Sequence, residues 1–196
     1  MAVAFTDYEK EIIREKLILS AKECLKKYGV KKTTVDELSK MAGISKGAFY
    51  IFFESKEALF FEVLEDFQKN IFKDAFKDLD SYSKDYKYLF TETIFNLIIS
   101  VKNSFIINII KNNEIELIYR KLPEKVLLKH DDFDEALANH MIEKFNLENK
   151  IDKNVLVAVL RAIFMTLLHE REIGNNFDEA IKILIEGLAN SIFEVN

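Results

Sequence analysis

A short segment near the N-terminus combines small, hydroxyl-bearing and basic residues in a pattern suited to binding a polyanion. Ser45, Lys46, Gly47 and Ala48 follow one another, and Tyr50 comes two residues later. Small residues let a backbone approach base edges, whereas hydroxyl and ammonium groups bind phosphate oxygens. These residue types favour recognition of nucleic acid over catalysis.

Two short helices separated by a glycine are expected to position these residues. Thr34 has the spacing of a capping box with a Glu three residues later, and it opens a helix that ends at Gly43. Ser45 can cap a second helix over about 46–53. This order predicts a helix-turn-helix, whose second helix enters the major groove of DNA.

The second of these helices has two different faces when residues are placed at about 100° per position. Phe49, Phe52 and Phe53 share one face, and Gly47 and Ile51 lie opposite. We expect the phenylalanines to be core. Because an apolar side chain that faces the groove can contact a thymine methyl, we expect this contact from Ile51.

The remaining sequence predicts helices and no sheet. It has one proline and five glycines in 196 residues, whereas average usage would give about ten and about fourteen. We predict an all-α fold, with a three-helix helix-turn-helix DNA-binding domain in 1–60 and a larger helical domain in 61–196. The other helices are expected at about 6–29, where Thr6 and Glu9 have the capping-box spacing, and at 55–79, 86–111, 113–121, 132–146, 152–172 and 177–194.

Composition excludes several classes of protein. With 49% hydrophobic and 31% charged residues, the chain is too apolar to be disordered. Its one cysteine, Cys24, cannot form an internal disulfide, and we expect a core residue. The longest nearly apolar stretch, 155–168, contains Arg161 and is shorter than the ~20 residues that a spanning helix needs. We therefore expect a soluble cytoplasmic protein with no membrane partner.

The charge is distributed unevenly along the chain. Residues 1–60 contain 11 Lys and Arg against 9 Asp and Glu, whereas residues 61–196 contain 17 against 24. The net charge of −5 therefore does not exclude a nucleic-acid partner for the first third of the chain.

The segment from Thr33 to Phe60 closely resembles the DNA-binding domain of the TetR (tetracycline-repressor) family. The resemblance covers about residues 10–65 and rests on Thr33-Thr34-Val35, Ala42-Gly43-Ile44-Ser45-Lys46-Gly47, Phe49-Tyr50, Phe53 and Ser55-Lys56-Glu57. It implies phosphate contacts from Thr34, Tyr50 and Lys56, and base or groove contacts from Ser45, Lys46, Gly47 and Ala48. The family often has His and then Tyr where this chain has Ile51 and Phe52, so a polar contact is missing there.

For 61–196, the resemblance implies a helical ligand-binding and dimerisation domain. It would consist of a helical sensor region followed by a two-helix dimerisation element, in 152–172 and 177–194. Apolar stripes on these helices are expected to form a four-helix interface between two subunits, although they could instead be the core of a monomer. The stripes contain Leu156, Val159, Leu160, Ile163, Leu167, Ile181, Leu184, Ile185, Leu188 and Ile192.

A pocket for an apolar or amphiphilic small molecule is expected among aromatic side chains of the sensor region. The candidate lining residues are Phe95, Phe105, Tyr119, Phe133, His140 and Phe164. Glu114, Glu116 and Arg120 are expected on a solvated face, whereas a buried one among them would fix the polarity of the ligand.

We therefore expect a homodimeric repressor that binds a palindromic operator in double-stranded DNA and is released by a small molecule. No cofactor, metal site or catalytic residue is predicted. His130, His140 and His169 lack metal-ligand spacing and are not expected to be catalytic. One alternative is a helical interaction protein that senses no ligand. The other is an enzyme domain fused to a DNA-binding module, but the sequence has no nucleophile elbow, metal motif or phosphate loop.

Overall fold

The computed structural model describes residues 5–77, 85–127 and 133–194. These residues form helices and no strand, which confirms the all-α prediction. None of the described helices is both long and apolar enough to cross a bilayer. The chain forms two compact units, of which the first takes the described residues of 1–67 and 105–129 and the second those of 68–104 and 130–196.

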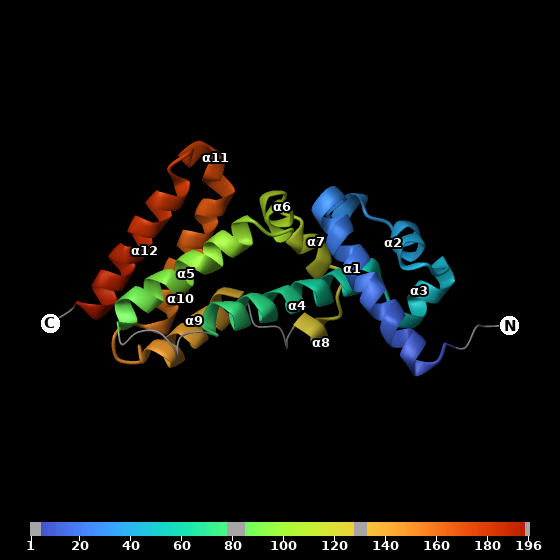
Figure 1. The fold of residues 1–196 in the computed structure, drawn as a ribbon, viewed down its shortest axis with the longest axis horizontal. Coiled ribbons are helices and arrows are strands. Elements are labelled where there is room, and N and C mark those ends of the chain that lie inside the picture. The colour runs from blue at the N-terminus through green and yellow to red at the C-terminus, as the bar shows by residue number, and fades with distance from the viewer. Residues whose placement is uncertain (1–4, 78–84, 128–132, 195–196) are drawn as a thin grey trace. The chain divides into compact units, whose positions relative to one another are not determined.

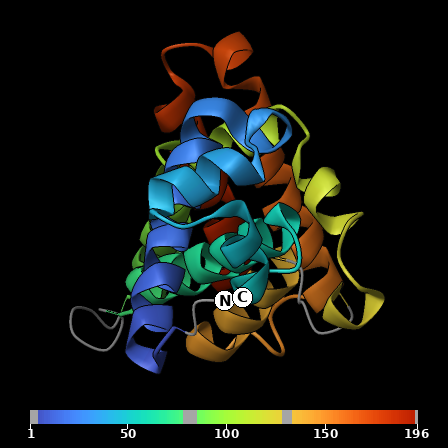
Figure 2. The same cartoon turned by 90° about the vertical axis from the view of Figure 1, so that its right-hand side faces the viewer.

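The first unit contains the predicted helix-turn-helix. Its helices are α1 (Asp7–Lys32), α2 (Val35–Ala42), α3 (Lys46–Phe52), the first part of α4 (Lys56–Phe76), α6 (Ile106–Lys111), α7 (Ile115–Tyr119) and α8 (Glu124–Leu127). Helix α2 packs against both α1 and α3, as Figures 1 and 2 show in blue to cyan. Helices α6 and α7 pack on α1 and contribute Ile109 and Ile118 to the same core.

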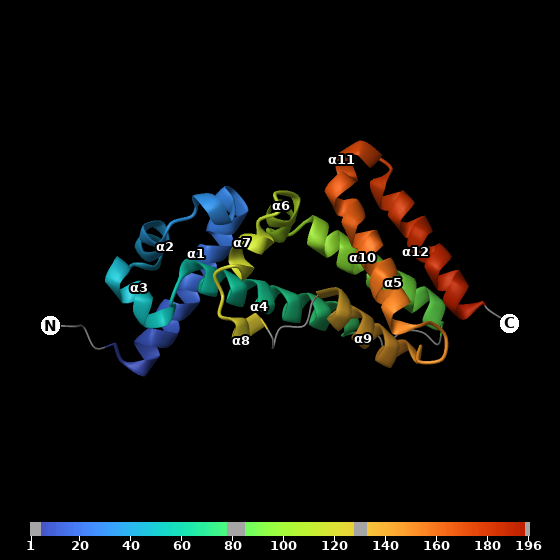
Figure 3. The same ribbon diagram turned by 180° about the vertical axis from the view of Figure 1, so that it is seen from behind.

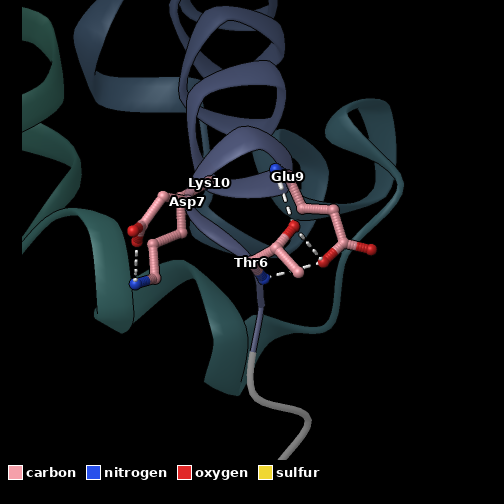
Figure 4. A network of polar contacts seen from close by, with 4 residues as sticks. All are labelled: Thr6, Asp7, Glu9 and Lys10. Atoms are coloured by element: carbon pink, nitrogen blue, oxygen red, sulfur yellow. Dashed lines mark hydrogen bonds and ion pairs between the residues drawn. The ribbon is translucent and has the colours of Figure 1, made fainter.

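The start of α1 confirms the capping box that the sequence predicts. The Thr6 hydroxyl accepts the N–H of Glu9 at 3.2 Å, and the Glu9 carboxylate accepts the N–H of Thr6 at 2.8 Å (Figure 4). The hydrogen bonds from Thr6 lower the pKa of Glu9. The cap therefore stabilises the folded state at neutral pH, and this contribution is lost as acid protonates Glu9.

The second unit consists of longer helices that pack in pairs. It contains the end of α4 with α5 (Tyr86–Lys102), α9 (Phe133–Phe145), α10 (Lys153–Met165), a 3₁₀ turn (Thr166–His169), α11 (Glu170–Ile173) and α12 (Phe177–Phe193). Helix α12 packs on α5 and α10 packs on α9, as seen from behind in Figure 3. Lys102 of α5 pairs with Asp178 at 2.6 Å and with Glu170 at 3.4 Å.

Two expected helices are interrupted where hydroxyl groups bind backbone carbonyls. The helix expected at 86–111 is divided into α5 and α6, and Ser104 donates to the carbonyl of Val101 at 2.7 Å. The helix expected at 152–172 changes to a 3₁₀ turn at Thr166, which donates to Ile163 at 2.6 Å. Such bonds compete with regular helix geometry.

Some expected boundaries cannot be compared with the structure. The ends expected at 79 and 132 lie outside the described residues, as does His130. Helix α8, which follows Pro123, is an element that the sequence analysis missed.

Candidate nucleic-acid interface

Helix α3 has the core face and the exposed face that its sequence predicts. Phe49 is completely buried and Phe53 is 6% exposed. On the other side, Tyr50 is 53% and Ile51 is 59% exposed, and Gly47 is also exposed. The exposed residues therefore occupy a surface that is supported from below by a packed core.

Both helices of the motif begin at hydroxyl caps. Thr34 accepts the N–H of Glu37 at 3.2 Å, and Ser45 accepts the N–H of Ala48 at 3.1 Å. Because a hydroxyl has one donor besides its acceptor sites, both side chains keep an O–H that can donate to a phosphate oxygen. Gly43, with a φ of 74°, provides the left-handed residue that ends α2.

Gly47 has no packing reason to be a glycine. A Cβ built on it would meet only the Ser45 hydroxyl, at an ordinary distance of 3.9 Å. Since helix interiors disfavour glycine, a residue with a side chain would suit the fold at least as well. The missing side chain instead leaves the backbone of α3 open to a close approach by a ligand.

Lys46 forms an ion pair on the exposed surface. Its ammonium lies 2.7 Å from a carboxylate oxygen of Asp36, on α2, and this hydrogen bond raises the pKa of Lys46. The cation remains exposed, so a phosphate would compete with Asp36 for it.

Lys56, expected at a phosphate, has a different arrangement. Its ammonium donates to the carbonyls of Val30 at 2.8 Å and Thr33 at 2.7 Å. These carbonyls lie in the last turn of α1 and at its C-cap, where a cation is favourable. An ammonium has three donors, so Lys56 holds the turn before α2 and has at most one N–H left for a phosphate.

Glu114 is buried, contrary to the expectation of a solvated charge. It is 7% exposed, and its carboxylate accepts the N–H of Val30 at 2.6 Å. Glu116 and Arg120 are exposed, as expected, and lie 3.7 Å apart. The buried carboxylate therefore binds the protein backbone, which corrects the idea that it would fix the polarity of a ligand.

The six candidate ligand residues are divided between the two units. Phe105 packs against Phe67 and Tyr119 against Phe61, all in the first unit. In the second unit, Phe133 contacts the rings of Phe72 and Phe164, and His140 contacts Phe72 and Phe76. Phe95 lies under the ammonium of Lys182, at 5.4 Å.

A cavity of about 430 Å³ lies between α4 and α5 in the second unit. None of the six predicted residues lines it. Apolar and acidic side chains both contribute to its wall, which includes Ile71, Asp74, Leu89, Glu92, Thr93 and Leu97. Among the described residues, no group of three or more His, Cys, Asp and Glu side chains could hold a metal ion.

Most of the predicted dimerisation residues belong to the core of the single chain. The buried ones are Leu156, Leu160, Ile163, Leu167, Ile181, Ile185 and Ile192, whereas Val159 and Leu188 are half-buried and Leu184 is exposed. In the single chain, these seven buried side chains therefore pack against the rest of the second unit. Leu184 and residues outside the predicted stripes leave an apolar surface exposed, which we call the outer stripe. It contains Val155, Ala158, Ala162 and Met165 on α10, and Leu184 and Gly187 on α12.

The buried cysteine confirms the sequence interpretation. Cys24 is 1% exposed and donates to the sulfur of Met41 at 3.5 Å. Burial raises the pKa of its thiol to about 11, so the reactive thiolate is disfavoured at neutral pH.

The chain is similar to one family model and to a relative of comparable length. The model described as bacterial regulatory proteins, tetR family, matches residues 17–63. QacR, an HTH-type transcriptional regulator of Staphylococcus aureus, is 30% identical over 183 residues, which cover 88% of this chain and 92% of QacR. The chain belongs to the TetR family.

Other relatives of this TetR-family chain match over short segments. Three HTH-type transcriptional regulators of Bacillus subtilis align over 52 to 61 residues, and the chain spans only 18% to 32% of their length.

Solved structures share the TetR-family fold over nearly the whole chain. A TetR-family transcriptional regulator from Mesorhizobium loti is 14% identical with a TM-score of 0.63, and the match covers 97% of this chain and 98% of that one. FadR from Bacillus subtilis, solved in complex with stearoyl-CoA, is 13% identical with a TM-score of 0.59, and covers 93% and 99%. At these identities, the likeness shows the fold alone.

Proposed function

We propose that this TetR-family chain is a homodimeric transcriptional repressor that binds a palindromic operator and is released from it by a small molecule. The exposed face of α3 carries the proposal. It presents Gly47, Tyr50 and Ile51 to solvent above a packed core, and the fold has no need of a glycine there. A face of this kind fits the major groove of DNA.

Each exposed group is assigned a role by its chemistry. The hydroxyls of Thr34, Ser45 and Tyr50 donate to phosphates, and Lys46 adds a cation. Gly47 and Ala48 allow the backbone of α3 to approach the base edges.

Replacing Ile51 by alanine is expected to lower affinity about threefold to tenfold for duplexes with thymine at one position, and to relax the preference there. The reason is that alanine is too short to reach the methyl group. Selection of duplexes by the variant, followed by sequencing, measures this preference. Leu19→Ala, which truncates another exposed apolar side chain on α1, is the matched control. A variant that kept its preference at every base position would refute the contact.

Replacing Asp36 by asparagine is expected to strengthen binding to all duplexes several-fold at low salt. The change removes a negative charge from the DNA face and frees Lys46 from its ion pair. The slope of log affinity against log salt should steepen by up to about one unit. Asp7→Asn, which breaks a similar exposed pair with Lys10 at 2.9 Å, should leave binding unchanged. Unchanged or weaker binding by Asp36→Asn would contradict the placement of Lys46 at DNA.

The proposed dimer uses the outer stripe rather than the buried stripes. On α10, its residues are spaced three and four positions apart, and small residues there allow close approach of helices. Two copies of α10 and α12 would then form a four-helix interface, and its two-fold symmetry matches a palindromic operator.

The proposed effector is an apolar or amphiphilic small molecule that binds in the second unit. The cavity beside α5 and the aromatic cluster around Phe72 support this choice, because they combine apolar surface with a few charged groups. FadR, which shares the fold, was solved with stearoyl-CoA, an amphiphilic molecule of the class proposed here. Release requires that the effector bind better to a conformation with low operator affinity.

A further inference from the structure

Two charged side chains hold the end of α1, where the helix is kinked at Gly29 before the connection to α2. Glu114 accepts the N–H of Val30 at 2.6 Å, while Lys56 donates to the carbonyls of Val30 and Thr33 at 2.8 and 2.7 Å. The Thr33 hydroxyl donates to the carbonyl of Gly29 at 2.7 Å. We call residues 29–33, which are the kinked last turn of α1 and its C-cap, the clasped turn. It fixes the approach to Thr34, the cap of α2.

The fit around Gly29 shows that the carboxylate is closely placed. Gly29 has a φ of 73° and a ψ of −173°, a conformation that is essentially restricted to glycine. A Cβ at this position would lie 2.5 Å from the Oε2 atom of Glu114. Because a buried carboxylate is costly without hydrogen-bond donors, the bond to Val30 gives Glu114 a specific role.

The two side chains come from segments that continue into the second unit. Lys56 is the first residue of α4, and the boundary between the units lies within this helix. Glu114 lies between α6 and α7, in the segment that follows α5 along the chain. Displacement of either segment therefore acts on the clasped turn, which leads directly into α2 and α3.

We propose that Glu114 is a positioning residue for sequence recognition, which transmits the position of the α6–α7 segment to α3 through the N–H of Val30. This inference rests on the proposed DNA-binding function. Without the carboxylate, α3 is held less firmly relative to α1. Phosphate contacts tolerate small reorientations, whereas base contacts require a fixed geometry.

The test compares Glu114→Ala and Glu114→Gln with Glu116→Ala, an exposed carboxylate of α7 that serves as the matched control. The first probe is a duplex selected by the wild-type protein, and the second is a random duplex of the same length. We expect Glu114→Ala to lose about tenfold or more in affinity for the selected duplex and less than about threefold for the random one. Glu114→Gln keeps an acceptor oxygen and should recover most of the affinity.

Hydrogen exchange of the free protein supplies a readout that needs no DNA. We expect amides of residues 30–52 to exchange faster in Glu114→Ala while the second unit remains unchanged. If Glu114→Ala fails to fold, Glu114→Asp takes its place, because the shorter side chain keeps the charge but withdraws the carboxylate from the N–H of Val30.

The two readouts separate failure of this inference from failure of the proposed function. A folded Glu114→Ala protein with wild-type exchange in residues 30–52 overturns the inference, as does equal loss of affinity for both duplexes. If the wild-type protein selects no duplex, DNA recognition fails. In that case, faster exchange at residues 30–52 would still support the positioning role, and unchanged exchange would overturn it.

Discussion

Replacing Gly47 by valine is expected to reduce operator affinity on the order of a hundredfold, because several base contacts are lost together. The side chain would stand on the exposed face of α3 and hold its backbone away from the bases. The fold should be unaffected, because the nearest atom to a Cβ at this position is the Ser45 hydroxyl, at 3.9 Å. Valine also has a higher helix propensity than glycine.

Fluorescence anisotropy with a labelled operator duplex and thermal unfolding of the free protein together test this prediction. Gly47→Ala, with its smaller side chain, should have an intermediate affinity. Both variants should unfold at the wild-type temperature or slightly above it. An unfolded Gly47→Val protein would show that the glycine serves packing, and a folded variant with full affinity would place the DNA elsewhere.

Replacing Leu184 by arginine is expected to convert the proposed dimer to monomers. Leu184 is 54% exposed in the single chain and lies on the outer stripe, so the change should not disturb the core. In the proposed interface, the arginine would be buried without a partner. This costs about 4 kcal/mol, or roughly a thousandfold in the dissociation constant of the dimer.

Light scattering across a range of protein concentrations measures this effect. Asn190→Arg places the same charge on another exposed part of α12 and should remain dimeric. Ile185→Arg should instead unfold the second unit, because Ile185 is completely buried. A dimeric Leu184→Arg protein would exclude the outer stripe from the interface.

The helix-turn-helix could be predicted from sequence because its signals are local. The hydroxyl caps at Thr34 and Ser45 and the left-handed Gly43 act within three or four residues, so their spacing specifies each helix boundary. The faces of α3 also follow from helical periodicity alone, since Phe49 and Ile51 have clearly different neighbours.

Features that depend on contacts between distant segments could not be predicted from the sequence. Helices α10 and α12 are apolar on more than one side, so periodicity could not decide which stripe faces the core and which remains exposed. The positions of Lys56 and Glu114 depend on Val30, which is 26 residues from the first and 84 from the second. For Glu114, the sequence shows only a charged residue among apolar neighbours. This pattern does not identify the N–H of Val30 as the group that the carboxylate binds.

The ligand residues were predicted by residue type, and residue type does not distinguish a core from a pocket. Phe105 and Tyr119 pack against Phe67 and Phe61 in the first unit. The cavity beside α5 is lined by smaller apolar and charged side chains that an aromatic pattern cannot identify.

Selection of DNA by the purified protein from a randomised duplex library, with a count of protomers on each bound duplex, tests the central claim most directly. We expect enrichment of an inverted repeat occupied by an even number of protomers, because two copies of α3 would read successive major grooves. Absence of enrichment over random DNA at low salt would contradict the account. So would a single protomer bound to an asymmetric site.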